Sequence, residues 1–439
     1  MAAARAVPDI TGGVPAIDHH SHASMSRFRT VEQIERAFAT AHLEANVPPA
    51  VYLEYIAARN AGDAATLARL DAGHGTEALM LAGLTFRSTT FFARALREGC
   101  RDLYGPSGDW DALMRTAQEW GERGPAWPYD RAIEVARTPI VLTDVPYIDR
   151  AHWRSEHFRQ IARIDPYLYP FHPGTAPGRG TEYQRFHTVF ANVLAKELQG
   201  YGMAQPPAGF DDYIQFVDAS LARRVDEGAI GLKIVSAYVR KIDFADANRD
   251  EAASVYTALA TGKTVDTAPL ENFIVRRLAH WAAERSLPMQ IHVGMGHPEP
   301  GMRVANSAPF LLERFLDTPS LNRLRVVLLH GGYPFSSDVA ALAQTYGNVF
   351  IDFSWMPYLH HYYLRTKLAE WLEILPANKV MYGSDTSAPE FHVAAARFAR
   401  ESLNHVLADG HARGIWDTKQ IDWLARRILF ENTAEVYGL

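Results

Sequence analysis

Eight short apolar segments, spread along the chain of 439 residues, constrain its fold more than any other feature. Helical patterns lie between most of these segments. Continuous apolar segments are typical of strands that are covered on both faces, as in a parallel sheet. Eight strands alternating with helices predict an α/β fold of the (β/α)8 type, the TIM-like barrel. The predicted strands are residues 14–22, 139–144, 159–164, 229–236, 288–293, 325–331, 348–353 and 379–385.

The spacing between the predicted strands is uneven. Residues from about 27 to 137 carry only helical patterns, which predicts a large helical insertion after the first strand. Insertions after barrel strands lie at the C-terminal face, where they can cover an active site. No internal repeat, low-complexity tract or Pro/Gly-rich linker separates domains. We therefore expect a single barrel domain over residues 1–439 that includes the insertion.

Composition and charge argue against several kinds of partner. The net charge is −6 and the basic residues are scattered, so we expect no nucleic-acid partner. No apolar stretch has the length of a membrane span or of a signal peptide, which predicts a cytoplasmic protein without a membrane partner. The single cysteine, Cys100, excludes an internal disulfide and a thiolate zinc cluster, and its helical context indicates a structural residue. Any metal site must use carboxylates and the 18 histidines.

Five residues with metal-ligating side chains stand at the ends of predicted strands. His20 and His22 are two apart on the first strand, so both side chains point to the same side. An H-x-H pair alone is weak evidence for a metal. His292, His330 and Asp385, however, end the fifth, sixth and eighth strands, and these ends meet at the C-terminal rim of a barrel. The set indicates a metal site rather than histidines that merely pack in the core.

Four further residues are candidates for substrate binding. Arg163 lies in the third strand, and a buried arginine usually has a paired carboxylate or a ligand. Tyr238 and Arg240 follow the fourth strand and could contact an anionic substrate, with a surface role as the alternative. Trp355 follows the seventh strand and could line the pocket, with core packing as the alternative. Asp144 and Asp352, in the second and seventh strands, are interpreted as structural.

The strand-end motifs resemble those of the amidohydrolase superfamily. The matching segments are Asp18–His22, Gln290–Val293, Leu329–Gly331 and Tyr382–Asp385. Residues 428–439 are similar to the terminal helix of the amidohydrolase-related branch. Residues 232–240 and 330–335 are most similar to the hydrolase-like part of FluG-type glutamine-synthetase fusions. The resemblance covers nearly the whole barrel and fails over the helical insertion, so it does not identify a substrate.

The resemblance implies a role for each candidate ligand. His20, His22, His292 and Asp385 would hold a divalent metal, zinc in the first place with manganese as the alternative, as one or two ions. Asp385 would accept a proton from water that the metal acidifies and pass it to the leaving group. His330 would polarise the substrate or complete a second metal site. Asp385 and His330 are therefore the expected catalytic residues.

Lys233 has three interpretations. Two-metal members of the superfamily carry a carbamylated lysine in the fourth strand, and Lys233 with His330 would complete such a binuclear set. A free ammonium that binds a substrate carboxylate above a single metal is an equal alternative. A lysine paired with a nearby acid is the third, which we favour least, because a lysine inside an apolar strand is costly unless it is used.

These expectations lead to a metal-dependent hydrolase that cleaves a C–N (amide-type) or ester-like bond of a small polar, carboxylate-bearing molecule. Non-oxidative decarboxylation of an aromatic or unsaturated acid is the alternative on the same barrel, and sugar-acid isomerisation is a third option. A catalytically inactive barrel that serves as a binding module would be expected to lack ligands, and here all are present. The sequence leaves open whether the chain forms a homo-oligomer.

Overall fold

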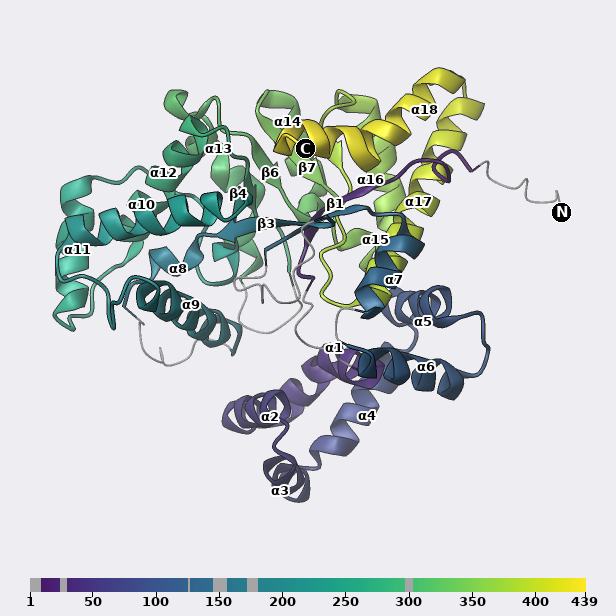
Figure 1. Ribbon diagram of the computed structural model, residues 1–439, viewed down its shortest axis with the longest axis horizontal. Coiled ribbons are helices and arrows are strands. Elements are labelled where there is room, and N and C mark those ends of the chain that lie inside the picture. Colours follow the sequence, from purple (N-terminus) through teal and green to yellow (C-terminus); the bar gives the residue numbers. More distant parts are fainter. Residues whose placement is uncertain (1–8, 24–29, 125–126, 145–155, 172–180, 297–302) are drawn as a thin grey trace.

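Eight parallel strands follow one another around a barrel in chain order, which confirms the predicted fold (Figure 1). The structure is a computed structural model and describes residues 9–23, 30–124, 127–144, 156–171, 181–296 and 303–439. The strands are β1 (Ile17–Ser21), β2 (Ile140–Thr143), β3 (Phe158–Arg163), β4 (Ala229–Ile234), β5 (Met289–Ile291), β6 (Val326–Leu328), β7 (Val349–Asp352) and β8 (Val380–Met381). Backbone hydrogen bonds join β1 to the residues after β8, from His19 N to Tyr382 O and from Asp385 N to His20 O.

Helices surround the strands and bury both of their faces, as the continuous apolar segments predict. The longer ones are α9 (Thr181–Gln199), α10 (Phe210–Asp226), α11 (Arg249–Ala260), α12 (Ala268–Glu284), α14 (Ser336–Thr345), α16 (His361–Ile374), α17 (Pro389–Ala412) and α18 (Thr418–Arg426). A short helix, α19 (Asn432–Tyr437), packs Val436 and Tyr437 against inward-facing residues of the strands, including Ile17, Ile161 and Val327. This helix therefore closes one end of the barrel.

Seven helices lie between β1 and β2 in the described part of the chain. They are α1 (Val31–Asn46), α2 (Pro49–Ala61), α3 (Ala64–His74), α4 (Thr76–Arg87), α5 (Phe91–Tyr104), α6 (Trp110–Glu122) and α7 (Trp127–Ala136). Figure 1 shows α1 to α4 projecting away from the strands, and these helices share a small core of their own around Leu43, Tyr52 and Met80. In contrast, α5 and α7 pack on α17 of the barrel. Cys100 of α5 is buried in that interface, where burial raises the pKa of its thiol.

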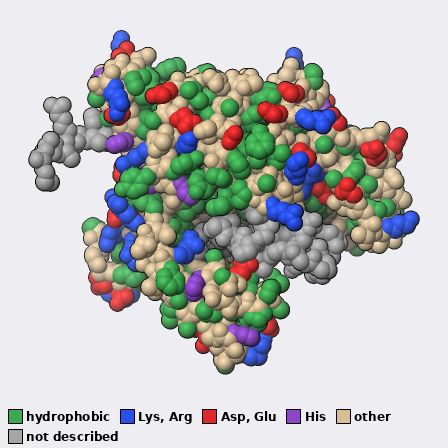
Figure 2. Space-filling view, turned by 180° about the vertical axis from the view of Figure 1, so that it is seen from behind, with side chains coloured by type: hydrophobic (Ala, Val, Ile, Leu, Met, Phe, Trp, Pro, Cys, Tyr) green, Lys and Arg blue, Asp and Glu red, His purple; other side chains and the backbone are tan. Residues whose placement is uncertain are grey.

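The described surface carries charged side chains of both signs. On the face seen in Figure 2, Lys and Arg side chains and Asp and Glu side chains are both visible among the described residues. Among the helices that the structure describes, none combines the length and the apolar character that a membrane span requires.

Candidate metal centre

Two histidines of β1 and its C-terminal extension meet a carboxylate from the turn after β8. Nε2 of His20 lies 3.1 Å and Nε2 of His22 2.9 Å from Oδ1 of Asp385. The turn bends back toward β1 because Asp385 adopts a φ of 54° and its backbone N–H donates to the His20 carbonyl at 2.8 Å. Asp18 of β1 also holds this turn, since its carboxylate accepts hydrogen bonds from the backbone N (2.7 Å) and the hydroxyl (2.5 Å) of Ser384. The first strand thus positions both its own imidazoles and the carboxylate that they face.

Gln290 of β5 determines which nitrogen of His20 is free to bind a metal. Its Oε1 lies 2.9 Å from Nδ1 of His20, and its Nε2 donates to the carbonyl of His19 at 2.9 Å. A carbonyl only accepts, so the amide NH2 must face His19 and Oε1 must face His20. Nδ1 of His20 therefore carries the hydrogen, and Nε2, which faces Asp385, presents a lone pair.

His22 is held by a second acidic residue. Asp144, which follows β2, contacts Nδ1 of His22 through Oδ1, and its Oδ2 accepts a hydrogen bond from Arg163 at 2.5 Å. Burial lowers the pKa of His22, but the carboxylates of Asp144 and Asp385 outweigh this effect and raise it to about 9. A cation on Nε2, either a proton or a metal ion, is thus strongly favoured at this position.

The donor set fits a divalent metal. Oδ1 of Asp385 is buried, and two imidazole nitrogens face it. Burial raises the pKa of Asp385, but His330, His20 and His22 outweigh this and hold it well below its usual range, so the carboxylate is anionic. A lone pair opposite a carboxylate oxygen is repulsive unless a cation lies between them. Neutral imidazoles with a carboxylate are typical zinc ligands.

His292 and His330 complete the cluster from β5 and β6. Nε2 of His330 lies 2.9 Å from Nδ1 of His292, and Nδ1 of His330 lies 3.4 Å from Oδ2 of Asp385 and 2.9 Å from Oγ of Ser354. Nε2 of His292 is buried and has no hydrogen-bond partner among the described residues. Burial lowers the pKa of both histidines well below the usual value, which keeps them neutral. The tightest group of ligand atoms is His20, His330 and Asp385, so His330 lies nearer to the centre than the sequence-based set of four suggests.

Backbone strain is concentrated at this rim. His330, Trp355 and Asp385 follow β6, β7 and β8, and all three have positive φ values, of 64°, 70° and 54°. Residues other than glycine seldom adopt this conformation, and where they do, the strain often marks a functional site. Trp355 also donates its indole N–H to the carbonyl of Asp385 at 3.0 Å, and its ring lies 5.5 Å from that of His330.

Lys233 lies inside the cluster. Its Nζ is 3.3 Å from Nε2 of His20, and the residue is 1% exposed. Burial lowers its pKa to about 8, although Asp144 and Asp385 partly offset the effect. Lys233 and Arg163 are register partners on neighbouring strands, so two basic side chains lie side by side at the rim. The sequence-predicted ligands thus lie at one rim of the barrel, and ligand atoms of His20, His330 and Asp385 lie within 4.8 Å of one another.

Of the other predicted substrate contacts, one lies beside the metal cluster and another is paired with residues outside it. Tyr238 lies over His292, with ring centroids 4.7 Å apart. Arg240 instead forms an ion pair with Glu271 at 2.8 Å and a hydrogen bond with Asn272 at 2.5 Å. The substrate-binding roles of these residues, and of Arg163 and Trp355, remain predictions.

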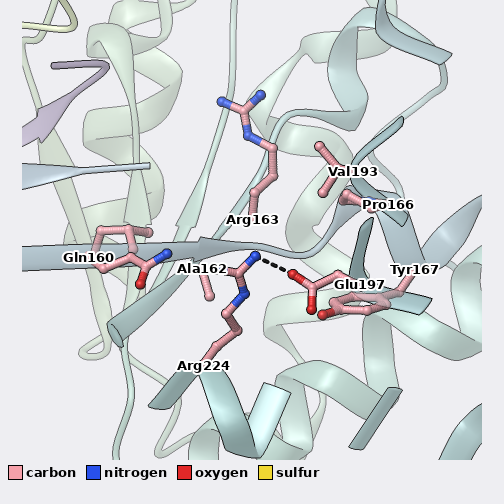
Figure 3. Close-up of a pocket in the computed structure, with 9 residues that line it drawn as sticks. Gln160, Ala162, Arg163, Pro166, Tyr167, Val193, Glu197 and Arg224 are labelled. Atoms are coloured by element: carbon pink, nitrogen blue, oxygen red, sulfur yellow. Dashed lines mark hydrogen bonds and ion pairs between the residues drawn. The ribbon is translucent and has the colours of Figure 1, made fainter. Parts of the chain in front are cut away.

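A small cavity beside β3 is separate from the metal cluster (Figure 3). It is lined by residues that include Ala162, Tyr167, Glu197 and Arg224, and the last two form an ion pair within it. Figure 3 shows the Arg163 guanidinium extending to the other side of the strand, away from this pair. Ile161 packs in the barrel interior, so alternation places Arg163 on the inner side as well. The cavity belongs to the layer between β3 and its helices.

Among the residues that contact the ligands, the sequence reasoning missed Asp144 and Gln290, which hold His22 and His20. Asp144 was interpreted as structural, although it follows a strand at the same rim as Asp385. Gln290 is two residues before His292, and strand alternation could have placed both on the inner side. The sequence contains a usable signal for both.

Comparison with known proteins identifies relatives of the chain. A family model described as amidohydrolase matches residues 125–439. The protein FluG of Emericella nidulans is 24% identical over 376 residues, which are 80% of this chain and 41% of the relative, so the chain spans about two fifths of that protein. Among solved structures, a Lactobacillus casei protein assigned as a metal-dependent hydrolase has a TM-score of 0.69 at 17% identity, over 98% of this chain and 96% of its own. A uronate isomerase from Thermotoga maritima has a TM-score of 0.68 at 11% identity, over 98% and 95% of the two chains. At these identities the structural likeness shows the fold alone.

Proposed function

This chain belongs to the amidohydrolase family of metal-dependent enzymes, and from that premise we propose that it hydrolyses a C–N (amide-type) or ester-like bond of a small polar molecule that carries a carboxylate. One observation supports a metal-dependent reaction most directly. The lone pair of His20 and the ring nitrogen of His22 converge on one anionic oxygen of Asp385. This arrangement suits a divalent metal beside a carboxylate that can accept a proton.

The metal is proposed to be zinc, with manganese as the alternative. His20, His22 and Asp385 would hold it together with His292 or His330, which present neutral imidazoles. When bound, the metal would supply Lewis-acid chemistry that acidifies water and polarises a carbonyl group. The surrounding side chains would transfer the protons and bind the substrate.

Asp385 is the proposed general base. Its lowered pKa keeps it deprotonated, so it would be free to accept a proton from water and to return that proton to the leaving group. His330 is the proposed polarising group, because its imidazole lies between Asp385 and His292. The tryptophan indole that donates to the Asp385 carbonyl would keep the strained turn in place.

The carboxylate of the substrate is proposed to bind near Arg163. This guanidinium is bound on one side by Asp144, while its Nε is buried without a hydrogen-bond partner among the described residues. Lys233 is its neighbour across the strands and could add a second positive charge. A carboxylate would satisfy both groups.

Lys233 has a competing role as a carbamate that bridges two metals. A neutral amine is the form that reacts with carbon dioxide, and a pKa lowered to about 8 increases its fraction near neutral pH. The metal content of protein purified without chelator distinguishes the roles. Two equivalents per chain would support the carbamate, and one would support the ammonium as a substrate contact.

Decarboxylation is the second candidate function, favoured by the two adjacent basic side chains, Arg163 and Lys233, that could orient a carboxylate. A direct experiment is to incubate the zinc-loaded protein with N-acyl amino acids, their carboxamide analogues and unsaturated or aromatic acids. We expect amine release from the N-acyl amino acids and little from the carboxamides. Release of carbon dioxide from the acids, without any hydrolysis, would replace the hydrolase with the decarboxylase.

A further inference from the structure

A hydrogen-bonded chain joins His20 to Tyr437 at the opposite end of the barrel. Tyr437 belongs to α19, and the carbonyl of Glu435 in this helix accepts a hydrogen bond from Arg325, the residue before β6. The helix therefore covers the N-terminal ends of the strands, whereas His20 lies at their C-terminal ends. The Tyr437 ring packs inside the barrel, and its hydroxyl points toward the centre.

The first branch of this chain runs through Gln290. The amide nitrogen of Gln290 donates to Oη of Tyr437 at 2.8 Å and to the carbonyl of His19 at 2.9 Å. Both hydrogens of the amide are thereby used, and its oxygen is fixed toward Nδ1 of His20. Because an amide oxygen only accepts, the hydrogen of His20 stays on Nδ1 and the lone pair on Nε2.

The second branch runs through His19 and Asp352. Nε2 of His19 lies 2.8 Å from Oδ2 of Asp352, so this nitrogen carries the hydrogen, and Nδ1 accepts from the Tyr437 hydroxyl at 3.4 Å. The other oxygen of Asp352 accepts the backbone N–H of His330 at 2.5 Å. Two hydrogen-bonded routes thus start at the Tyr437 hydroxyl. One runs through Gln290 to the ring of His20, and the other runs through His19 and Asp352 to the backbone of His330.

We propose that Tyr437 is a positioning residue for the metal centre, which fixes the tautomer of His20 through Gln290 and thereby sets the metal affinity. The inference rests on the proposed metal centre. Without the hydroxyl, one amide hydrogen of Gln290 loses its acceptor, so only the carbonyl of His19 still opposes reversal of the amide. The reversed amide would turn its NH2 toward Nδ1 of His20 and drive the imidazole hydrogen to Nε2, the atom that has to bind the metal.

Tyr437→Phe tests this proposal, because it removes the hydroxyl and keeps the ring. Tyr256→Phe is the matched control, since Tyr256 of α11 is also buried and its hydroxyl donates to the carbonyl of Pro207 at 2.5 Å, away from the metal centre. Zinc affinity is measured by competition with a chromophoric chelator, and the stability of the metal-free protein by thermal unfolding. Tyr437→Phe should weaken zinc binding by about tenfold or more. Tyr256→Phe should leave zinc affinity unchanged, although it also removes a tyrosine hydroxyl that forms a hydrogen bond.

The route through Gln290 is tested with Gln290→Met, which removes the acceptor of His20 at similar volume. In that background Tyr437→Phe should change zinc affinity much less than in the wild type. An undiminished effect would overturn the route through Gln290. Equal zinc binding by the wild type and Tyr437→Phe would overturn this inference and leave the proposed function intact. Failure of the wild type to bind zinc or manganese would overturn the proposed function and the inference together.

The tautomer itself gives a readout that needs no metal. Long-range proton–nitrogen spectra of metal-free protein with isotope-labelled histidine distinguish hydrogen on Nδ1 from hydrogen on Nε2, and His20→Asn assigns the signal. Tyr437→Phe should increase the population with hydrogen on Nε2, whereas Tyr256→Phe should match the wild type. A His20 signal that is identical in all three proteins would overturn the proposal.

Discussion

Nζ of Lys233 lies 3.3 Å from Nε2 of His20, so a lysine amine occupies the space beside a nitrogen that is expected to bind a metal. Gln290 accepts the hydrogen of His20 on Nδ1, so lysine is the donor in this contact. A metal that binds Nε2 of His20 has to replace this hydrogen bond from Lys233. The state of Lys233 is therefore coupled to metal binding, whether the lysine becomes a carbamate or remains an ammonium.

The first prediction concerns Lys233 and the pH dependence of stability. Its pKa is about 8 in the folded protein against 10.5 in the unfolded chain. At pH values between these two pKa values, the unfolded state binds more protons than the folded state. The buried ammonium therefore lowers the free energy of unfolding by its full amount at pH 7 and by less as the pH rises. Lys233→Met removes this penalty of about 3 kcal/mol at neutral pH. We expect the metal-free wild type to gain stability relative to the variant between about pH 8 and 10.5.

Denaturant unfolding in the presence of a chelator measures that difference. The wild type and Lys233→Met are compared at neutral pH and near pH 10, where the unfolded lysine begins to lose its proton. If the two stability profiles run parallel over this range, the amine is not held at a lowered pKa.

The second prediction concerns Asp144 and His22. The metal-free His22 has a pKa of about 9, because Asp144 and Asp385 outweigh the effect of burial. A metal must displace that proton, so the apparent zinc affinity should fall about tenfold for each pH unit below 9. Asp144→Asn keeps an oxygen near Nδ1 but removes the charge, so this decline should begin at a lower pH.

Zinc titrations from acidic to alkaline pH, performed on the wild type and on Asp144→Asn, test this effect. Asp218→Asn serves as the control, because Asp218 also pairs with an arginine, Arg277, in α12 of the outer layer. The control should reproduce the wild-type curve. An unshifted curve for Asp144→Asn would mean that this carboxylate does not set the protonation of His22.

Strand β5 illustrates what the sequence could and could not predict about the site. Alternation along the strand is enough to place Gln290 and His292 on one side, and strand ends are enough to bring His20 and Asp385 together. The contact of Gln290 with Tyr437 spans 147 positions and depends on how α19 enters the barrel. No local pattern carries that information, because it arises from packing of the whole chain.

The same distinction applies to the fold. Each strand is buried on both faces, so eight apolar segments predict the barrel. The helices of the insertion could be predicted from their periodicity, but their docking could not. A Cβ added to Gly99 of α5 would lie 2.1 Å from the carbonyl oxygen of Glu390 in α17, so this glycine permits a close approach of two helices. A lone glycine within a helical pattern does not reveal its partner.

The third prediction concerns Asp385 as the proposed base. Asp385→Asn keeps the size of the side chain and one oxygen toward His20 and His22, but it cannot accept a proton. We expect turnover to fall by about a hundredfold to ten-thousandfold, with zinc partly retained. Activity is compared at equal metal content, with circular dichroism as the check of folding. Turnover close to that of the wild type would remove Asp385 from this role.

The fourth prediction distinguishes the two arginines that could hold a substrate carboxylate. Arg163 has a buried Nε without a hydrogen-bond partner among the described residues, whereas Arg240 is occupied by Glu271 and Asn272. Arg163→Gln should raise KM for an N-acyl amino acid by about tenfold to a hundredfold, because a hydrogen bond to a charged group contributes about 1.5–3 kcal/mol. It should change KM for the matching carboxamide much less.

Arg240→Gln is the matched comparison for this experiment, because it removes a guanidinium that follows the neighbouring strand. If Arg163 binds the carboxylate, Arg240→Gln should affect the acid and the carboxamide equally and act mainly on stability, since Glu271 then loses its buried partner. If Arg240→Gln alone raises KM selectively for the acid, the carboxylate binds after β4 rather than after β3. The substrate would then lie nearer to Tyr238 than to Asp144, and Arg163 would act only as the partner that fixes Asp144 against His22.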